Sequence, residues 1–152
     1  MNIKNSLLEP KPFLKWAGSK KWLVPFIKKY IPSKFNRYYE PFLGSGAVFF
    51  ILKPKNAHLS DFNDDLINTY KTLREYPEEV IKELKKMPYD KDFFYRIRDN
   101  FKPKNEIEKA AKLIYLNRTC WNGLYRENSD GKFNVPFGRF ENPKICDTNK
   151  IF

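Results

Sequence analysis

The chain has 152 residues, 41% of them apolar, which is enough for the core of one ordinary domain. This composition excludes a disordered chain and a collagen-like fibre. Lys and Arg total 29 against 18 Asp and Glu, a formal charge of +11, and aromatic residues make up 17% of the chain. A basic, aromatic chain suits a polyanion whose bases can be stacked upon, although a general excess of solvated lysine gives the same totals.

The composition gives no indication of a membrane span or a metal site. The longest apolar run, from Ala47 to Leu52, is far shorter than a membrane span, and the N-terminus lacks a signal-peptide core. The two cysteines, Cys120 and Cys146, have no zinc-ligand spacing, and His58 is the one histidine. We therefore expect a cytoplasmic protein with no membrane or metal partner and with packed, reduced thiols.

Positive charge is concentrated at the start of the chain, since residues 1–37 hold nine Lys or Arg and one acid, Glu9. Within this segment, apolar side chains recur at helical spacing after Ser19 and predict an amphipathic helix. Pro25 must start or bend that helix, and Pro32 ends it. The apolar positions are Trp22, Leu23, Phe26, Ile27 and Tyr30.

The next segment has the pattern of two strands that alternate with two helices. Residues 37–42 are aromatic enough for a short strand, the glycine turn 43–46 breaks it, and residues 47–52 resume as an apolar helix. A second strand, 57–60, ends at Asp61. Asn63 is expected to cap a helix whose apolar face consists of Leu66, Ile67, Tyr70 and Leu73.

From residue 77 the pattern predicts helices and then a hairpin. Pro77 suits the first position of one helix, residues 90–101 predict a second, and Asn105 suits the cap of a third. Their apolar positions include Val80, Ile81, Leu84, Ile107, Ala110, Ala111, Ile114 and Tyr115. After Cys120, the pair Asp130-Gly131 lies between segments 124–126 and 133–135, which predicts a hairpin with a two-residue turn.

The strand, Gly-x-Gly turn and helix form a geometry that lets a cofactor approach the backbone of an open α/β sheet. Gly44-Ser45-Gly46 lacks the third glycine of a dinucleotide fingerprint and the Lys-Ser/Thr of a phosphate loop. These absences argue against hydride transfer and nucleotide hydrolysis. By itself the turn is equally an ordinary tight turn.

Two other blocks strengthen the cofactor interpretation. Asp61 follows the second strand, where a carboxylate can accept hydrogen bonds from both ribose hydroxyls, although it can also cap the next helix. The segment 12–20 combines an aromatic residue, Trp16, with a glycine and the cation Lys20. Trp16 can equally be a core residue, so periodicity alone does not decide whether this segment binds a cofactor.

Four blocks in this order strongly resemble the Dam-type adenine-specific DNA methyltransferases, which take a methyl group from S-adenosylmethionine. The blocks are PFLKWAGSK, YYEPFLGSGAVFF, LSDFNDDLINTY and NRTCWNGLYRENSDGKFNVPFG. The resemblance spans roughly residues 11–147. It implies an α/β fold, with a partial Rossmann-like cofactor domain and an inserted target-recognition domain made of helices and a β-hairpin.

The resemblance also implies a division of the chain. Residues 1–65 would be the N-terminal part of the cofactor-binding domain, residues 66–147 the target-recognition domain, and residues 148–152 the start of the remaining catalytic part. A cofactor of this kind needs an apolar bed for adenine, a carboxylate for ribose and close backbone approach. The residues implied to bind S-adenosylmethionine are Trp16, Ala17, Gly18, Lys20, Glu40, Phe42, Gly44, Gly46 and Asp61.

The implied contacts with double-stranded DNA lie on the hairpin and just before it. Trp121 matches an aromatic wedge, Arg126 a reader of guanine, and Leu124 and Pro136 neighbours of other target bases. Asn122 suits base readout, and Arg118 suits a phosphate contact. Trp121 can also be a core aromatic at a helix end. Agreement with family members that recognise GATC makes that site the leading expectation.

The family's Asp-Pro-Pro-Tyr loop, which engages the amino group of the flipped adenine, has no counterpart here, because no Pro-Pro pair occurs. The sequence 134–137 imitates it, but Val135 replaces a proline and the segment falls inside the hairpin. No catalytic residue is assigned, and we expect no methylation by this chain alone. A truncated gene product, one subunit completed by a second chain and a fragment are the alternatives.

Two other functions use the same residues. A non-catalytic DNA-binding module would keep the basic segment and the hairpin, with the cofactor half-site as a remnant. An RNA-binding protein that stacks single-stranded bases on its aromatic residues is less well supported, because no RNP-type strand is present.

Overall fold

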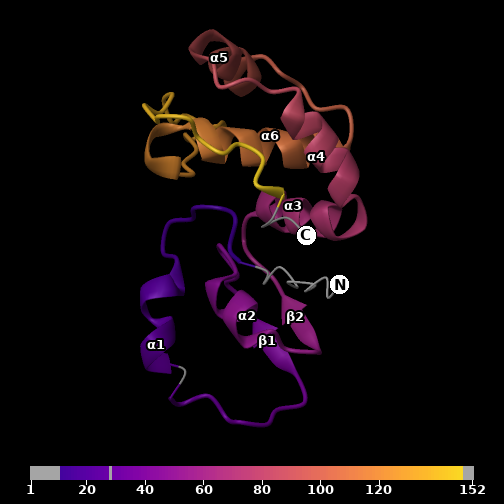
Figure 1. Ribbon diagram of the computed structural model, residues 1–152, viewed down its shortest axis with the longest axis vertical. Helices are drawn as coiled ribbons and strands as arrows, with labels where there is room; N and C mark the ends of the chain where they lie inside the picture. The colour runs from indigo at the N-terminus through magenta and orange to yellow at the C-terminus, as the bar shows by residue number, and fades with distance from the viewer. Residues whose placement is uncertain (1–10, 28, 149–152) are drawn as a thin grey trace, which may run out of the picture.

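The computed structural model describes residues 11–27 and 29–148, which form two parts (Figure 1). The helical part consists of α3 (Asp64–Glu75), α4 (Pro77–Lys85), α5 (Lys91–Asp99), α6 (Glu106–Thr119) and the chain that follows to residue 148. The strand part, residues 19–62, contains η1 (Lys20–Trp22), α1 (Val24–Ile27), β1 (Tyr38–Glu40), α2 (Ala47–Leu52) and β2 (Ala57–Leu59). Residues 11–18 cross from one part to the other.

The strands β1 and β2 pair in parallel, with Tyr38 opposite Ala57 and Glu40 opposite Leu59. The β-α-β order predicted from the sequence is confirmed, although both strands are shorter than predicted. Beyond β1 the pairing continues as single bonds, from the Ser60 amide to the Glu40 carbonyl and from the Leu43 amide to the Ser60 carbonyl. These bonds place the glycine turn and Asp61 beside each other at the carboxyl ends of the strands.

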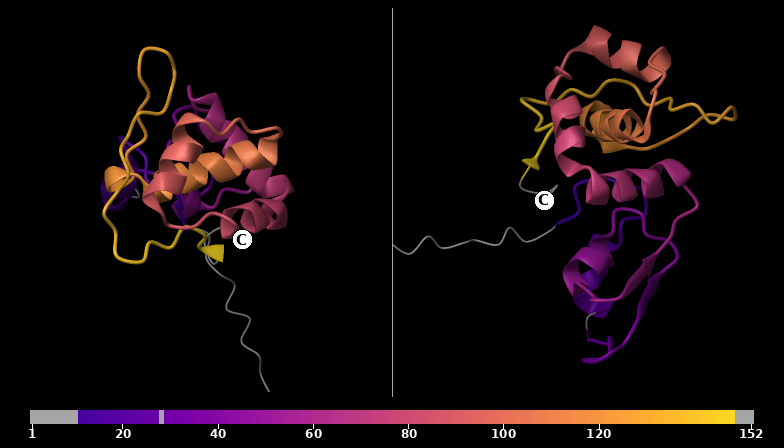
Figure 2. Two further views of the ribbon diagram at one scale, coloured as in Figure 1. Left: turned by 90° about the horizontal axis from the view of Figure 1, so that it is seen from above. Right: turned by 90° about the vertical axis from the view of Figure 1, so that its right-hand side faces the viewer.

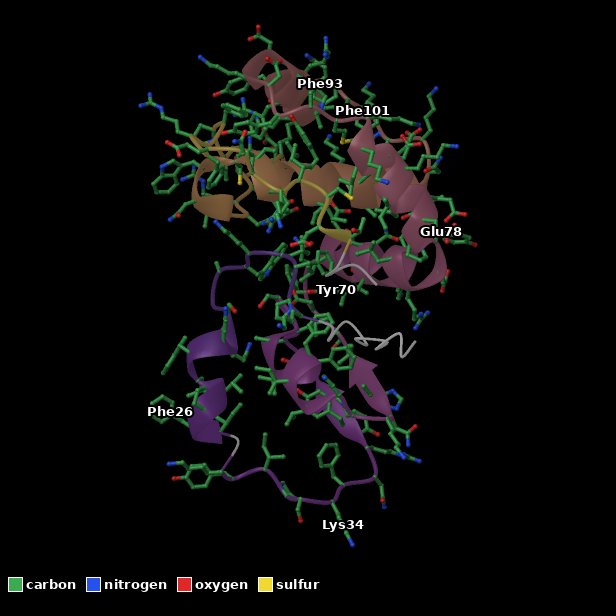
Figure 3. The ribbon with its side chains drawn as sticks, viewed as in Figure 1. Phe26, Lys34, Tyr70, Glu78, Phe93 and Phe101 are labelled. Carbon is green, nitrogen blue, oxygen red and sulfur yellow. The ribbon has the colours of Figure 1, made fainter. Side chains whose placement is uncertain are left out.

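The prediction of a long amphipathic helix after Ser19 is wrong. The chain forms the short 3₁₀ turn η1 and the one-turn helix α1, in which Pro25 occupies the second position. Proline has no amide hydrogen and is tolerated only in a helix's first turn, so it starts α1 and prevents a continuous helix. The expected apolar face is also not buried, because Trp22 is 72%, Phe26 60% and Tyr30 86% exposed. Figure 3 shows Phe26 on the outer side of α1.

The helix starts of the helical part follow the sequence signals. Asn63, Asp90 and Asn105 each accept a hydrogen bond from the backbone amide three residues later, as capping residues do. Pro77 begins α4, where its missing amide hydrogen costs nothing. The predicted helices in residues 64–119 are therefore confirmed in type and near their predicted starts.

Helix α6 is the centre of the core, because α3, α4 and α5 all pack against it. Its fully buried side chains include Ala110, Ala111, Ile114 and Tyr115, and burial raises the pKa of Tyr115 to about 12. Cys120 at its end is buried as well, and burial raises the pKa of that thiol to about 11. Cys146 is half-buried, and both cysteines are free.

After α6 the chain runs out and returns as the hairpin segment, residues 120–138, which protrudes from the helices in both views of Figure 2. Its two arms meet only at isolated antiparallel bridges, Cys120 with Phe137 and Glu127 with Phe133. The predicted two-residue turn is wrong. The Asn128 amide donates a hydrogen bond to the Lys132 carbonyl, so residues 129–131 form a three-residue loop. Gly131 in this loop has φ 70°. A three-residue loop places glycine in this left-handed position.

Candidate functional site

A cavity of about 200 Å³ lies at the carboxyl ends of β1 and β2. Three segments far apart in the sequence contribute to its lining: residues 16–20, six residues between Glu40 and Ala47, and Asp61. Eight of the nine residues predicted to bind the cofactor line this strand-end cavity: Trp16, Ala17, Gly18, Lys20, Glu40, Phe42, Gly44 and Asp61. The ninth, Gly46, does not line it. Ser19, Leu43, Ser45 and Ala47 also line the cavity and were not predicted.

Glu40 supplies a buried acid to the cavity wall, with 7% of its surface exposed. Its Oε2 accepts a hydrogen bond from the Tyr38 hydroxyl at 2.8 Å. Among the residues that the structure describes, its buried Oε1 has no hydrogen-bond partner. Burial raises the pKa of the Glu40 carboxyl, and the Tyr38 hydrogen bond, the positive charge of Lys20 and the backbone amide of Phe49 oppose that shift. A buried carboxylate oxygen without a donor is costly, so this wall favours a donor or cation in the cavity.

Asp61 fastens the turn to the start of α3. Its Oδ2 accepts from the Gly44 amide at 2.8 Å, and its Oδ1 accepts from the Asn63 amide at 3.1 Å. Asn63, and not Asp61, is the N-cap of α3, since its side chain accepts from the Leu66 amide. Because each carboxylate oxygen has a second lone pair, Asp61 can still accept hydrogen bonds from a ligand in the cavity.

The glycine turn needs glycine at both ends. A Cβ on Gly44 would lie 3.3 Å from Cδ1 of Trp16, and its φ of 53° is left-handed. Gly46, at φ 67°, precedes α2, where a Cβ would lie 2.9 Å from the Phe50 ring. From the helical part, the Tyr70 hydroxyl donates to the Gly44 carbonyl at 3.2 Å. Figure 3 shows Tyr70 at the junction of the two parts.

Trp16 joins the cavity to the hairpin segment. It is half-buried, lines the cavity and stacks on Tyr125 with ring centroids 4.6 Å apart and planes inclined by 25°. Trp16 is therefore both a packed aromatic and a cavity residue, so the two interpretations of its sequence position are compatible. Lys20 closes the other side of the cavity, where its ammonium group donates to the Phe42 carbonyl at 3.1 Å.

Asn117 holds the same junction from α6, a role that was not predicted from the sequence. Its Oδ1 accepts from the Lys15 amide at 3.0 Å, and its Nδ2 donates to the Lys15 carbonyl at 2.7 Å and to the Gly123 carbonyl at 3.1 Å. Only 1% of Asn117 is exposed. The available signal was an amide that directly follows the apolar run 113–116, since such a group must find partners when it is buried.

The residues predicted to contact DNA lie on or next to the hairpin segment. Trp121 is 55% exposed, so the alternative of a core aromatic is wrong. Asn122 is exposed with φ 57°, and the exposed Arg126 donates from Nε to Oδ1 of Asn134 at 2.7 Å. Pro136 is exposed and Leu124 half-buried.

Arg118 is held differently from the other predicted DNA contacts. It lies in the last turn of α6, and its guanidinium donates from Nε and Nη2 to the Lys144 carbonyl, at 2.9 and 2.7 Å. This arrangement ties the end of the described chain to α6. A phosphate contact by Arg118 therefore has to share its guanidinium with this internal bond.

Within the part of the chain that the structure describes, no helix is long and apolar enough to cross a membrane. The same residues contain no group of three or more His, Cys, Asp or Glu side chains arranged to hold a metal ion.

The chain is similar to known proteins over most of its length. The profile of the family described as D12 class N6 adenine-specific DNA methyltransferase matches residues 16–151. Type II methyltransferase M1.LlaDCHI of Lactococcus lactis subsp. cremoris is 39% identical over 156 residues, which cover 98% of this chain and 55% of the relative. M.MjaIII of Methanocaldococcus jannaschii is 40% identical over 166 residues, covering 95% of this chain and 57% of that protein.

A DNA adenine methylase of Escherichia coli (strain K12) is 37% identical over 136 residues, which cover 86% of this chain and 49% of the relative. The chain thus spans about half the length of the curated relatives that it matches.

Proposed function

Because the chain belongs to the D12 class N6 adenine-specific DNA methyltransferases, we propose that it forms part of an enzyme that methylates the exocyclic amino group of adenine in double-stranded DNA. In this proposal the β1–α2–β2 unit is part of a Rossmann-like cofactor domain, residues 1–65. Residues 66–147 are an inserted target-recognition domain, which contains α4 to α6 and the hairpin segment. The methyl donor is S-adenosylmethionine.

The observation that carries this proposal is the strand-end cavity, which gathers eight predicted cofactor residues from three sequence blocks. The chemistry of its wall fits S-adenosylmethionine. The partnerless Oε1 of Glu40 suits a cationic donor, Asp61 offers acceptors for ribose hydroxyls, and Trp16 offers an aromatic face. When bound, the cofactor supplies an electrophilic methyl group to the target amine.

The cavity is small for such a ligand. Its volume of about 200 Å³ is below the range of roughly 300–1,000 Å³ that pockets for drug-sized ligands occupy. We therefore assign the described residues to one wall of the cofactor site. No Pro-Pro pair occurs in the 152 residues, so we assign no acceptor loop and expect no methylation by this polypeptide alone.

The hairpin segment is the proposed reader of the target. The exposed ring of Trp121 is available to wedge between base pairs, which requires a large apolar side chain outside the core. Arg126 presents a guanidinium of the type that reads guanine bidentately. By family resemblance the proposed target is GATC, with Leu124 and Pro136 beside other bases of the site.

Calorimetric titration with S-adenosylmethionine tests the cofactor assignment. We expect saturable binding by residues 1–152 and at least about tenfold weaker binding by Asp61→Asn, since one ionic hydrogen bond contributes roughly 1.5–3 kcal/mol. Asp92→Asn is the matched control, because Asp92 is exposed on the first turn of α5. DNA binding without any cofactor binding would favour the non-catalytic DNA-binding module instead.

A methylation assay with labelled cofactor and duplexes that contain GATC tests the rest. We expect no turnover by residues 1–152 and tighter binding to GATC duplexes than to duplexes with a scrambled site. Clear turnover would refute the inference that residues 1–152 lack the loop that engages the target amine. Equal binding to both duplexes would refute GATC as the target.

A further inference from the structure

A second cavity, the α6 groove, has a volume of about 590 Å³ and lies between α6, the loop after α5 and the hairpin segment. None of the residues predicted to bind the cofactor or DNA lines it. Its volume lies within the range of roughly 300–1,000 Å³ that small-molecule pockets occupy. The groove is therefore large enough for a small organic ligand, and it is separate from the strand-end cavity.

The apolar surface of the groove consists of two leucines and three aromatic rings. Leu113 and Leu116 of α6 are buried, whereas Phe101, Tyr125 and Phe133 are half-buried and keep part of their rings exposed. The rings of Tyr125 and Phe133, from the two arms of the hairpin segment, meet edge to face with centroids 5.6 Å apart. Partly exposed rings of this kind can pack against a flat heterocycle.

Some of the charges in the groove already have partners. The guanidinium of Arg98 holds the Asp99 carboxylate through two hydrogen bonds, at 2.7 and 3.0 Å. The ammonium group of Lys109 pairs with Glu106 at 2.9 Å. These internal pairs leave little charge for a ligand.

Three lysines from three different segments also line the groove: Lys102 on the loop after α5, Lys112 on α6 and Lys132 on the hairpin loop. In the described part of the chain, the ammonium groups of Lys102 and Lys132 make no hydrogen bond or ion pair. Lys112 is half-buried and donates to the Phe101 carbonyl at 2.8 Å, so two of its three N–H donors remain for a ligand. The groove thus offers several ammonium donors to one anion.

The surroundings of Lys112 add to this preference. Burial lowers the pKa of its ammonium group, and the negative charges of Asp65 and Asp99 oppose that shift. An anion in the groove would further compensate for the burial of this charge. Asp65 and Glu127 line the groove too, and Glu127 accepts a hydrogen bond from the Tyr125 hydroxyl. Their remaining lone pairs can accept hydrogen bonds from hydroxyl or amino groups.

We propose that the α6 groove binds a free nucleoside phosphate, with its base against the aromatic rings and its phosphates on Lys102, Lys112 and Lys132. Such a ligand combines a flat heterocycle, hydroxyl groups and a concentrated negative charge, so it matches all three kinds of side chain in the groove. A purely acidic ligand would leave the aromatic surface unused and would be repelled by the acids. The inference does not depend on the proposed function, because neither the cofactor nor duplex DNA takes part in it.

Calorimetric titration of residues 1–152 with guanosine 5′-diphosphate (GDP) tests the proposal, because GDP lacks the adenine of the proposed cofactor. We expect saturable binding of one GDP per chain. The variant Lys102→Ala, Lys132→Ala should weaken this binding about tenfold, since it removes two charge-assisted contacts. The control Lys82→Ala, Lys85→Ala removes two exposed lysines of α4 outside the groove and should bind GDP as the wild type does.

A second variant, Phe133→Leu, separates stacking from charge, because it removes a ring and keeps an apolar side chain. It should weaken GDP binding by about fivefold or more, since base–aromatic stacking contributes to affinity, and should leave the weaker binding of pyrophosphate unchanged. Thermal denaturation verifies that each variant folds. Absence of GDP binding by the wild type, equal losses in the groove and control variants, or binding of pyrophosphate as tight as that of GDP would overturn the proposal.

Competition experiments separate this site from the other two. We expect Asp61→Asn, in the strand-end cavity, to bind GDP as the wild type does, and GDP to stay bound in the presence of S-adenosylmethionine. Displacement of GDP by S-adenosylmethionine, or complete displacement by a saturating GATC duplex, would assign the nucleotide to one of those sites and overturn the proposal. Absence of cofactor binding by the wild type would instead refute the proposed function and leave the groove assignment standing.

Discussion

The helical part and the strand part are packed to different degrees. The large side chains with less than 2% exposure in the described residues, such as Phe94, Tyr115 and Val135, all belong to the helical part. The strand part leaves Phe42 71% and Phe62 99% exposed, yet it carries the buried Glu40. Stability and site chemistry therefore reside in different parts of the chain.

This difference means that the site depends on its ties to the helices. A two-stranded sheet has little stability of its own. Asn117 holds the backbone of Lys15, and Tyr70 holds the Gly44 carbonyl, so side chains of the helical part fix the loops that line the strand-end cavity. Substitutions in the helical core, at these hydrogen bonds and at the cavity therefore test how strongly the helical part positions the cavity loops.

The largest expected effect comes from the helical core. Phe94 is fully buried against Tyr115 and Phe137, and Phe94→Ala is expected to lower the free energy of unfolding by about 3–5 kcal/mol. Phe26→Ala, at a position 60% exposed in the strand part, should change it by less than about 0.5 kcal/mol. Chemical denaturation measures both, and similar losses would contradict the contrast between the two parts.

The next effect comes from the tie through Asn117. Asn117→Ala removes hydrogen bonds to Lys15 and Gly123, and we expect a loss of about 2–3 kcal/mol because buried backbone groups are left without partners. Amide hydrogen exchange of Lys15 should accelerate. The matched control is Asn68→Ala, because the buried Nδ2 of Asn68 has no hydrogen-bond partner within residues 11–27 and 29–148. An equal loss in both variants would show that the tie contributes nothing specific.

The helices of the helical part could be predicted because local sequence signals mark where they begin. Asn63, Asn105 and Pro77 mark helix starts by their own side-chain and ring chemistry, and the structure uses each as predicted. The nearness of Trp16, Gly44 and Asp61 was predicted from strand order and family resemblance together. Parallel strands bring their carboxyl ends to one edge, so this part of the candidate site was also accessible from the sequence.

The features that were missed depend on long-range packing. Helical spacing predicted a buried face for Trp22, Phe26 and Tyr30, but spacing does not specify what would cover that face. The role of Asn117 depends on a segment 102 residues away. The hairpin loop was missed because Asp130-Gly131 also fits a three-residue loop, and the pairing of Asn128 with Lys132 decides between them.

The ionisation of Glu40 is the next way to sharpen the comparison. Burial raises its pKa above the ordinary value of 4.5, so the folded state holds this proton more tightly than the unfolded state. The contribution is favourable below pH 4.5 and is lost as the pH rises from there through the higher folded pKa. Relative to Glu40→Gln, the wild type should therefore lose free energy of unfolding as the pH rises through this interval. Parallel pH profiles of the two proteins would contradict this prediction.

Cofactor binding should reverse the preference of Glu40. A cationic group beside its carboxylate favours the ionised form, so affinity for S-adenosylmethionine is expected to rise with pH across the same interval. The rise should be absent in Glu40→Gln. Calorimetric titration at several pH values measures it, and an unchanged pH dependence in the variant would assign the effect to another group.

The smallest expected effect is the stacking of Trp16 on Tyr125, the contact between the cavity wall and the hairpin segment. Stacked aromatic pairs contribute about 0.5–1.5 kcal/mol beyond the area that they bury, so a double-mutant cycle with Trp16→Leu and Tyr125→Leu should give a coupling energy in that range. Tyr125→Phe is the control, since it keeps the ring and removes only the hydroxyl that donates to Glu127. If the coupling energy changes when S-adenosylmethionine is bound, the hairpin segment senses the cofactor through this pair. An unchanged value would limit the stack to packing, and the two parts would then communicate through Asn117 and the backbone of Lys15 instead.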